Sequence, residues 1–272
     1  MMSQELSSLK RRRWGETLRR DKWWVEPLIV FTMLSGFIVY ATWAAFQNAH
    51  YEHKNYLSPF YSPVLWGESH HAWFAGERPG FWPGWLLFSP ALLILPFPAG
   101  FRLTCYYYRG AYYKAFWADP PSCSVGEPRN NYLGERYLPL VLQNIHRYFL
   151  YFALLFLCFL SYDAFCGFFF DNDGDGKFTN FGIGVGSIVL CVNVFLLGGY
   201  TLGCHSLRHL VGGWMDKFSH APARATCYNC VSCLNRQHMV WAWCSLVWVA
   251  FSDIYIRLCS MGILTDFHFT FT

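Results

Sequence analysis

Cysteine and histidine residues gather in the last third of the chain, in an arrangement suited to binding a metal. Cys230 and Cys233 form a C-x-x-C motif, interpreted as a turn that brings two thiolates to one ion, and His238 follows closely. His205 and His209 are i and i+4, so on a helix they share one face. Thiolate and imidazole donors together favour zinc or an iron–sulfur cluster over calcium or magnesium. These five residues are the predicted metal ligands.

The donor types leave the identity of the metal centre open. Two cysteines and two histidines suit a tetrahedral zinc site. They equally suit a Rieske-type 2Fe–2S cluster, in which two imidazoles replace two thiolates on one iron. Histidines on different helices are also able to hold a b-type haem, with His146 opposite His205 or His238. Sequence spacing alone does not choose among the three.

A short acidic segment reproduces the first half of a calcium-binding EF-hand loop. Asp171, Asp173 and Asp175 occupy its D-x-D-x-D-G positions. The position that needs a bidentate Glu is Gly182. A solvated acidic turn is therefore the favoured interpretation, and a calcium site is the alternative.

The overall composition places these candidates in a membrane protein. Hydrophobic residues make up 54% of the chain and charged residues only 14%, against about 25% charged in ordinary soluble domains. Aromatic residues reach 21%, as expected where Trp and Tyr line two membrane–water interfaces. A soluble enzyme is excluded, and membrane lipids, not nucleic acid, are the expected surroundings.

Five apolar segments approach the ~20 residues that cross a bilayer as a helix. They are Pro27–Phe46, Trp82–Thr104, Ile145–Phe169, Phe181–Leu202 and Met239–Leu264. The second contains four prolines, so we expect it to be kinked or broken. The predicted fold is all-α: a polytopic bundle of five transmembrane helices. Residues 1–26 form a basic interfacial segment, 27–264 the membrane domain and 265–272 an outer tail.

The distribution of cations predicts the orientation. Of 21 Lys and Arg residues, 17 precede the first span or lie in the loops 105–144 and 203–238 or at their edges. The other side keeps Lys54, Arg78, Lys177 and Arg257. Positive loops remain cytoplasmic, so the N-terminus is predicted inside. His146, His205 and His238 then reach about the same depth at the inner ends of three helices.

Four segments carry a resemblance to a known family. They read T-C-Y-Y-Y-R-G-A-Y-Y-K-A-F-W-A-D-P-P, L-Q-N-I-H-R-Y-F, G-C-H-S-L-R-H-L-V-G-G and C-V-S-C-L-N-R-Q-H-M-V-W-A-W-C-S-L. From about Trp14 to Gly262 the chain resembles the cytochrome b-like membrane anchor of a type F (actinobacterial-type) succinate dehydrogenase, respiratory complex II. The acidic segment at Asp171 is not part of that pattern.

The resemblance implies a role in electron transport. It implies a multi-pass protein of the bacterial cytoplasmic membrane that carries a flavoprotein subunit and an iron–sulfur subunit on its inner face. The long aromatic and basic loop between the second and third spans suits such docking. It also implies a Rieske-type 2Fe–2S cluster in the membrane domain, no haem, and menaquinone or ubiquinone as the electron acceptor. A higher oligomer is a further option.

His146, Arg147 and Tyr148 are the predicted quinone-binding residues. They open the third span at its inner end, and a His beside an Arg can hydrogen-bond a quinone carbonyl and supply a proton. Two alternatives to the Rieske-type relay are kept. One is an anchor with haem b, and the other is a transporter or scaffold with structural zinc.

Overall fold

The computed structural model describes residues 13–74, 76–128, 137, 140–171, 177–213 and 217–271. The chain divides into two compact units. The first consists of Met1–Ile38 and Arg102–Ile145, and the second of Val39–Phe101 and His146–Thr272.

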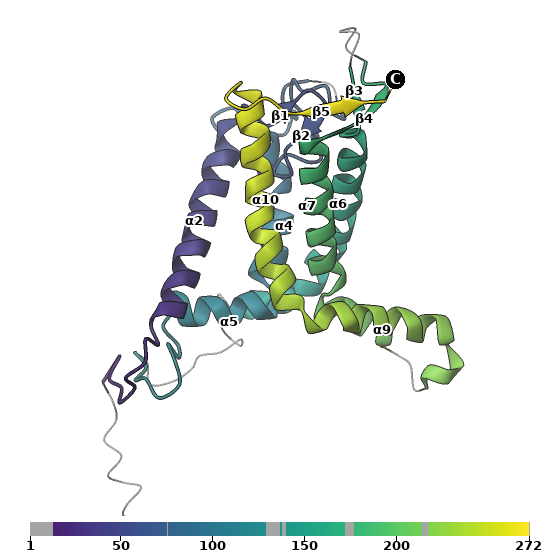
Figure 1. The fold of residues 1–272 in the computed structure, drawn as a ribbon. Helices are drawn as coiled ribbons and strands as arrows, with labels where there is room; N and C mark the ends of the chain where they lie inside the picture. Colours follow the sequence, from purple (N-terminus) through teal and green to yellow (C-terminus); the bar gives the residue numbers. More distant parts are fainter. Residues whose placement is uncertain are drawn as a thin grey trace, which may run out of the picture. The chain divides into compact units, whose positions relative to one another are not determined.

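Within the described residues, four helices are long and apolar enough to cross a membrane. They are α2 (Val25–Gln47), α6 (His146–Cys166), α7 (Val185–Leu202) and α10 (His238–Ser260) (Figure 1). A helix satisfies every backbone polar group within its own segment, which lipid requires. Pro27 is the third residue of α2, in the first turn, where a missing N–H costs no hydrogen bond. These helices match four of the five predicted spans.

The predicted span Trp82–Thr104 is broken, as its prolines indicated. It contains only the short helices α3 (Pro90–Ile94) and α4 (Pro96–Leu103), and each begins at a proline. Because a proline lacks the N–H that continues a helix, it favours a new start over continuation. This segment is not among the four long apolar helices, so the count of five spans stays a prediction.

Short strands gather at one end of the second unit, which we call the strand end (Figure 1). Strands β1 (Glu52–His53) and β2 (Tyr56–Leu57) pair in a hairpin. The antiparallel sheet β3-β4-β5 combines Phe169–Phe170, Asn180–Gly184 and His268–Thr270, with Phe169 opposite Phe181 and Ile183 opposite Phe269. These strands correct the purely helical expectation: residues 181–184 are a strand that precedes α7, and α10 ends at Ser260.

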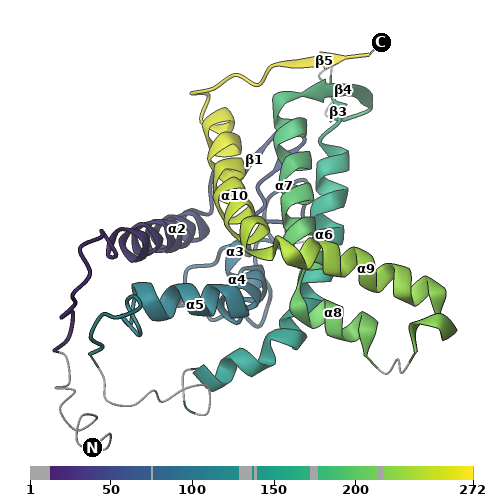
Figure 2. The ribbon, with the colours of Figure 1, turned by 60° about the horizontal axis from the view of Figure 1, so that its bottom comes forward.

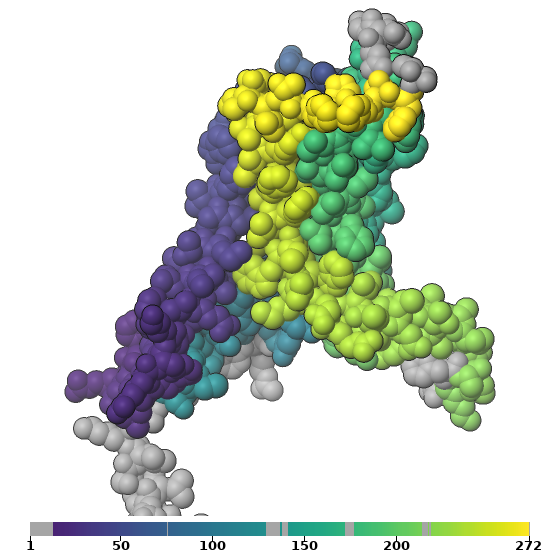
Figure 3. All heavy atoms as spheres, viewed as in Figure 1, coloured from purple at the N-terminus to yellow at the C-terminus, as the bar shows by residue number. Residues whose placement is uncertain are grey.

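The opposite end of the second unit carries the helices α8 (His205–Gly212) and α9 (Pro222–Arg236). We call it the histidine end, because α6, α8 and α10 all begin there with a histidine. In Figures 2 and 3, α9 extends sideways from the start of α10. The Arg224 guanidinium donates to the carbonyl oxygens of Val211 (2.5 Å) and Leu210 (3.4 Å). It thereby satisfies carbonyls that the end of α8 leaves without an intrahelical partner.

The remaining described helices are short. In the first unit, α5 spans Tyr106–Ala115 and the 3₁₀ helix η3 spans Leu140–Ile145. A second 3₁₀ helix, η4 (Phe218–His220), precedes α9 in the second unit.

Close packing joins α7 to α10. Gly199 lies against the Trp241 ring so closely that a Cβ there would approach it to 2.5 Å. Nearer the strand end, the Trp248 indole N–H donates to the Val189 carbonyl at 3.0 Å. Small residues at such contacts allow membrane helices to approach each other.

A buried ion pair lies in α10 near the strand end. Arg257 Nε donates to Asp253 Oδ2 at 2.7 Å, and their side chains are 4% and 0% exposed. The guanidinium also donates to the carbonyl oxygens of Ala44 (3.1 Å) and Ala49 (2.8 Å). Tyr40 donates to Asp253 Oδ2 at 2.5 Å. Arg257, counted among the outer cations from sequence, is thus an interior residue, and the pair fastens α10 to the second half of α2.

Replacing Asp253 by Asn, or Arg257 by Gln, is expected to destabilise the protein by roughly 3–5 kcal/mol, because each change leaves one buried charge uncompensated. Unfolding of the purified protein by denaturant in detergent measures the loss. The matched control is Arg236→Gln, since Arg236 is exposed at the end of α9. Equal stability of all three variants would contradict the assigned role of the pair.

Gly199→Ala is expected to cost roughly 1–3 kcal/mol, because the added methyl overlaps the Trp241 ring. Gly198 is the matched neighbour: a Cβ there meets Leu157 at 3.9 Å, an ordinary contact. Gly198→Ala should be neutral or slightly stabilising, since Ala favours a helix by about 1 kcal/mol over Gly. The same unfolding measurement separates the two, and equal losses would show that Gly199 does not limit helix approach.

Candidate functional site

The start of α6 provides a thiol–imidazole contact at the histidine end. His146 Nε2 lies 3.1 Å from Cys204 Sγ. Cys204 is 1% exposed and is the residue that caps the start of α8. The His146 ring stacks on Phe101, with the ring centroids 4.7 Å apart and the planes at 7°. Two soft metal-binding groups are therefore held together in a largely dry environment.

The start of α10 places a second imidazole in the interior. His238 is 2% exposed and stacks on Tyr200 with the centroids 4.9 Å apart. Tyr200 in turn meets Phe101 edge-on at 5.3 Å. The rings thus form a continuous series from His146 through Phe101 and Tyr200 to His238. Aromatic packing fixes both imidazoles and excludes water from the space between them.

His205 and His209 share the exposed face of α8 that their spacing predicts. Their Nε2 atoms are 3.0 Å apart and their rings meet at 82°. Partial burial, with smaller contributions from His209 and Arg208, lowers the pKa of His205. The neutral imidazole is the form that binds a metal.

Cys230 and Cys233 lie within α9, where both are exposed, and not in a turn as the C-x-x-C spacing suggested. Their i, i+3 spacing puts both sulfurs on one side of the helix. The predicted ligands are not gathered into one cluster: across the part of the chain that the structure describes, one trio of His, Cys, Asp or Glu ligand atoms lies within 4.8 Å, and it is Glu52, His70 and His71.

That trio was missed in the sequence. Its only sequence signal is the adjacent pair of histidines, and the carboxylate comes from a separate strand. The described residues also leave the calcium hypothesis open. Asp171 lies within them, but Asp173 and Asp175 lie outside.

The side chains of the three predicted quinone residues, at the start of α6, point in different directions. His146 is half-buried against Cys204, whereas Arg147 and Tyr148 are exposed, Tyr148 by 68%. Successive helical residues turn by roughly 100°, so these three side chains do not share one face. Arg147 and Tyr148 are available to a ligand in the surrounding lipid, while His146 faces the protein.

In the first unit, α5 presents the aromatic and basic segment that was assigned to docking. The Tyr112 hydroxyl donates to the carbonyl oxygens of Leu103 (2.5 Å) and Arg102 (3.0 Å), which fixes α5 to the preceding helix end. Burial raises the pKa of Tyr112. Lys114 and Trp117 are exposed, and the Trp117 ring lies 6.3 Å from that of Tyr113. This is a fixed surface whose Tyr and Trp side chains are of types enriched at protein interfaces.

Fold and site together define a multi-pass helical membrane subunit with buried thiol and imidazole groups at one end of its helices. Residues 25–262 match the family described as actinobacterial succinate dehydrogenase subunit SdhC. The chain therefore belongs to this family, whose members are multi-pass proteins of the bacterial inner membrane. A solved structure, that of the Mycobacterium smegmatis Sdh1 complex in the apo form, is similar. It contains a chain that is 42% identical with a TM-score of 0.82, and the match covers 95% of this chain and 96% of that one. A comparison with curated proteins gives no match.

Proposed function

We propose that this subunit anchors the flavoprotein and iron–sulfur subunits of succinate dehydrogenase and relays their electrons to quinone through a Rieske-type 2Fe–2S cluster. The observation that carries the relay is the buried contact of His146 with Cys204 at the histidine end. Family membership supports the partners. Positive-inside loops support a cytoplasmic N-terminus and support locating this end on the side where those partners are proposed to dock. The broken α3–α4 segment is proposed to complete the fifth crossing.

The residues at this end fit the proposed cluster by donor type. A Rieske-type centre needs two thiolates and two neutral imidazoles. When bound, such a cluster accepts and releases one electron. The chain's own contribution is to bury the donors: Cys204 and His238 are 1% and 2% exposed, and the Tyr200 ring stacks on His238.

Two ligand sets compete for this role. The set predicted from spacing takes Cys230 and Cys233 with two of His205, His209 and His238. The second set takes Cys204 with His146, and His238 belongs to either; this set supplies one of the two thiolates, and its second thiolate is unassigned. The 3.1 Å contact and the burial of Cys204 support the second set. The exposed positions of Cys230 and Cys233 support the first only if a docked partner protein covers α9.

Quinone is proposed to bind beside the inner end of α6. Arg147 and Tyr148 are exposed there, and a guanidinium and a phenol can donate hydrogen bonds to the two carbonyl oxygens of a quinone. Reduction adds negative charge to those oxygens, which a nearby Arg stabilises. His146 is the third proposed member. If His146 binds the cluster, it does not contact the quinone directly.

One observation disfavours a haem b held by His146 and His238, and it does not concern the pairing of His146 with His205. The rings of Phe101 and Tyr200 connect the His146 and His238 imidazoles through a series of ring contacts. A haem between these two histidines would require both aromatic rings to leave.

Replacing Tyr113, Lys114 and Trp117 together by Ala should release the soluble subunits without preventing membrane insertion. Truncating interface anchors of this kind costs about 2 kcal/mol each. The measurement is the amount of flavoprotein that co-purifies per anchor in mild detergent. The control replaces Phe267, Phe269 and Lys177, an exposed aromatic and basic set near the strand end. Full retention of flavoprotein by the α5 variant would contradict docking on this surface.

Cys204→Ser should abolish the Rieske-type electron paramagnetic resonance signal and quinone reduction, while succinate oxidation by a soluble dye continues. The joint replacement His205→Ala and His238→Ala should do the same, because His238 belongs to both sets. Cys158→Ser is the control, since Cys158 is exposed on α6 away from the site.

The comparison variant replaces both Cys230 and Cys233 by Ser. Loss of the signal there, with Cys204→Ser unaffected, would establish the set predicted from spacing. A wild-type complex without a Rieske-type signal would overturn the proposed relay itself. Zinc without cluster iron in the anchor would then favour the scaffold alternative.

A further inference from the structure

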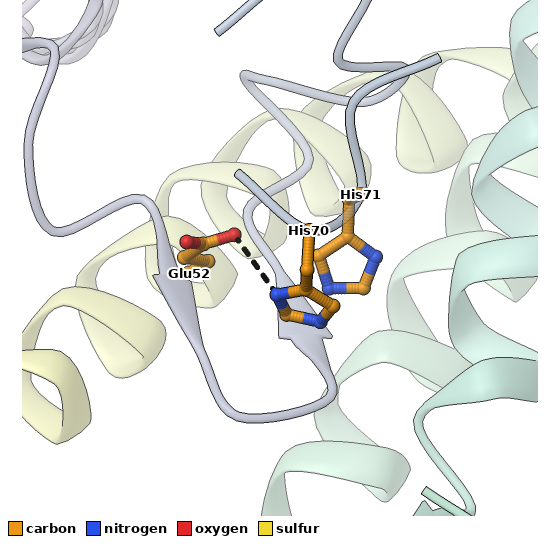
Figure 4. Close-up of side chains that lie close together, drawn as sticks. All are labelled: Glu52, His70 and His71. Atoms are coloured by element: carbon orange, nitrogen blue, oxygen red, sulfur yellow. Dashed lines mark ion pairs between the residues drawn. The ribbon is translucent and has the colours of Figure 1, made fainter. Parts of the chain in front are cut away.

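A second group of metal-binding side chains lies at the strand end. Glu52 is on β1, and His70 and His71 are adjacent in the loop that follows the β1–β2 hairpin (Figure 4). One ligand atom from each lies within 4.8 Å of the others. His70 Nδ1 is 3.7 Å from Glu52 Oε2. The centroids of the His70 and His71 rings are 3.9 Å apart. The three side chains therefore lie close together (Figure 4).

A buried serine holds these groups in position. Ser69 is 7% exposed, and its hydroxyl donates to Glu52 Oε2. The same hydroxyl oxygen accepts the His71 backbone N–H at 3.0 Å. The His70 ring also stacks on Phe178, with centroids 5.5 Å apart. Hydrogen bonds behind the donor atoms are how proteins orient metal ligands before the metal arrives.

One ring nitrogen of His71 is a buried polar atom. This atom, Nε2, has no hydrogen-bond partner among the residues that the structure describes. Leaving a buried polar atom unpaired is unfavourable, so such an atom calls for an explanation. A bound cation would give this atom a partner.

We propose that Glu52, His70 and His71 bind a divalent transition-metal ion of the zinc type. Two imidazole nitrogens and one carboxylate oxygen are a donor set that zinc accepts, with water in the fourth position. The absence of sulfur from this trio separates the site from the thiol-containing histidine end. Its effect is structural: the ion joins β1 to the 69–71 loop, and binding to the folded state alone adds stability by mass action.

The test uses the whole complex, purified in detergent without a polyhistidine tag. After treatment with chelator, the sample is equilibrated with micromolar zinc, and bound zinc is counted by mass spectrometry. The wild type should retain about one zinc ion per anchor, bound by nitrogen and oxygen at about 2.0–2.1 Å in X-ray absorption. Glu52→Gln and His71→Gln should each lose it. His53→Gln is the matched control, because His53 is on the same strand but outside the trio.

One further variant guards against simple misfolding. His70→Cys should keep the ion and add a sulfur neighbour at about 2.3 Å. Three outcomes would overturn the proposal. They are a wild type that binds no zinc, zinc content unchanged in Glu52→Gln and His71→Gln, and sulfur scattering in the wild type, which would assign the zinc to cysteines elsewhere.

Discussion

The buried pair of Asp253 and Arg257 is the constraint from which much of the second unit follows. Removing two charges from water costs several kcal/mol each, and only close partners offset that cost. The partners are the Tyr40 hydroxyl, the Ser58 hydroxyl and backbone carbonyls at the end of α2. The helix α10, the second half of α2 and the following loop must therefore assemble together. That assembly fixes the hairpin from which Glu52 projects.

The same helix determines what happens at its other end. Asp253 is fifteen residues beyond His238 in α10, roughly 22 Å along the axis at 1.5 Å per residue. Because the ion pair fixes the position of α10 along its axis relative to the second half of α2, it also fixes the position of His238. The approach of α7 at Gly199 then brings Tyr200 onto His238. A second small residue, Gly212, lets α8 lie against Tyr228 of α9. Small residues at two contacts thus position most of the histidine end.

The sequence was a good guide to long helices and a poor guide to contacts. Continuous apolar runs predicted α2, α6, α7 and α10, and four prolines predicted the break before Leu103. The strands β3 and β4 escaped because they continue the apolar runs of the neighbouring spans. The C-x-x-C motif suggested a turn, but Pro222 starts a helix that runs through both cysteines.

The contacts of the candidate site were hidden for a different reason. Phe101 and Tyr200 come from different helices, so no local pattern connects them with His146 or His238. Spacing within one segment reports neighbours on one helix, such as His205 and His209, and says nothing of which segments pack together. The Glu52, His70 and His71 trio is the same case, because only the hairpin and its loop bring its members together.

The two ends of the second unit differ in chemistry, and the ion pair near the strand end is compatible with both. The histidine end combines thiols with imidazoles, whereas the strand end combines imidazoles with a carboxylate. A lone charge in α10 would act strongly through the low-dielectric interior on any electron carrier nearby. Asp253 and Arg257 carry opposite charges 2.7 Å apart, so their fields largely cancel at a distance. An ion pair can therefore hold α10 against α2 inside the protein while adding little to the electrostatic potential at the histidine end.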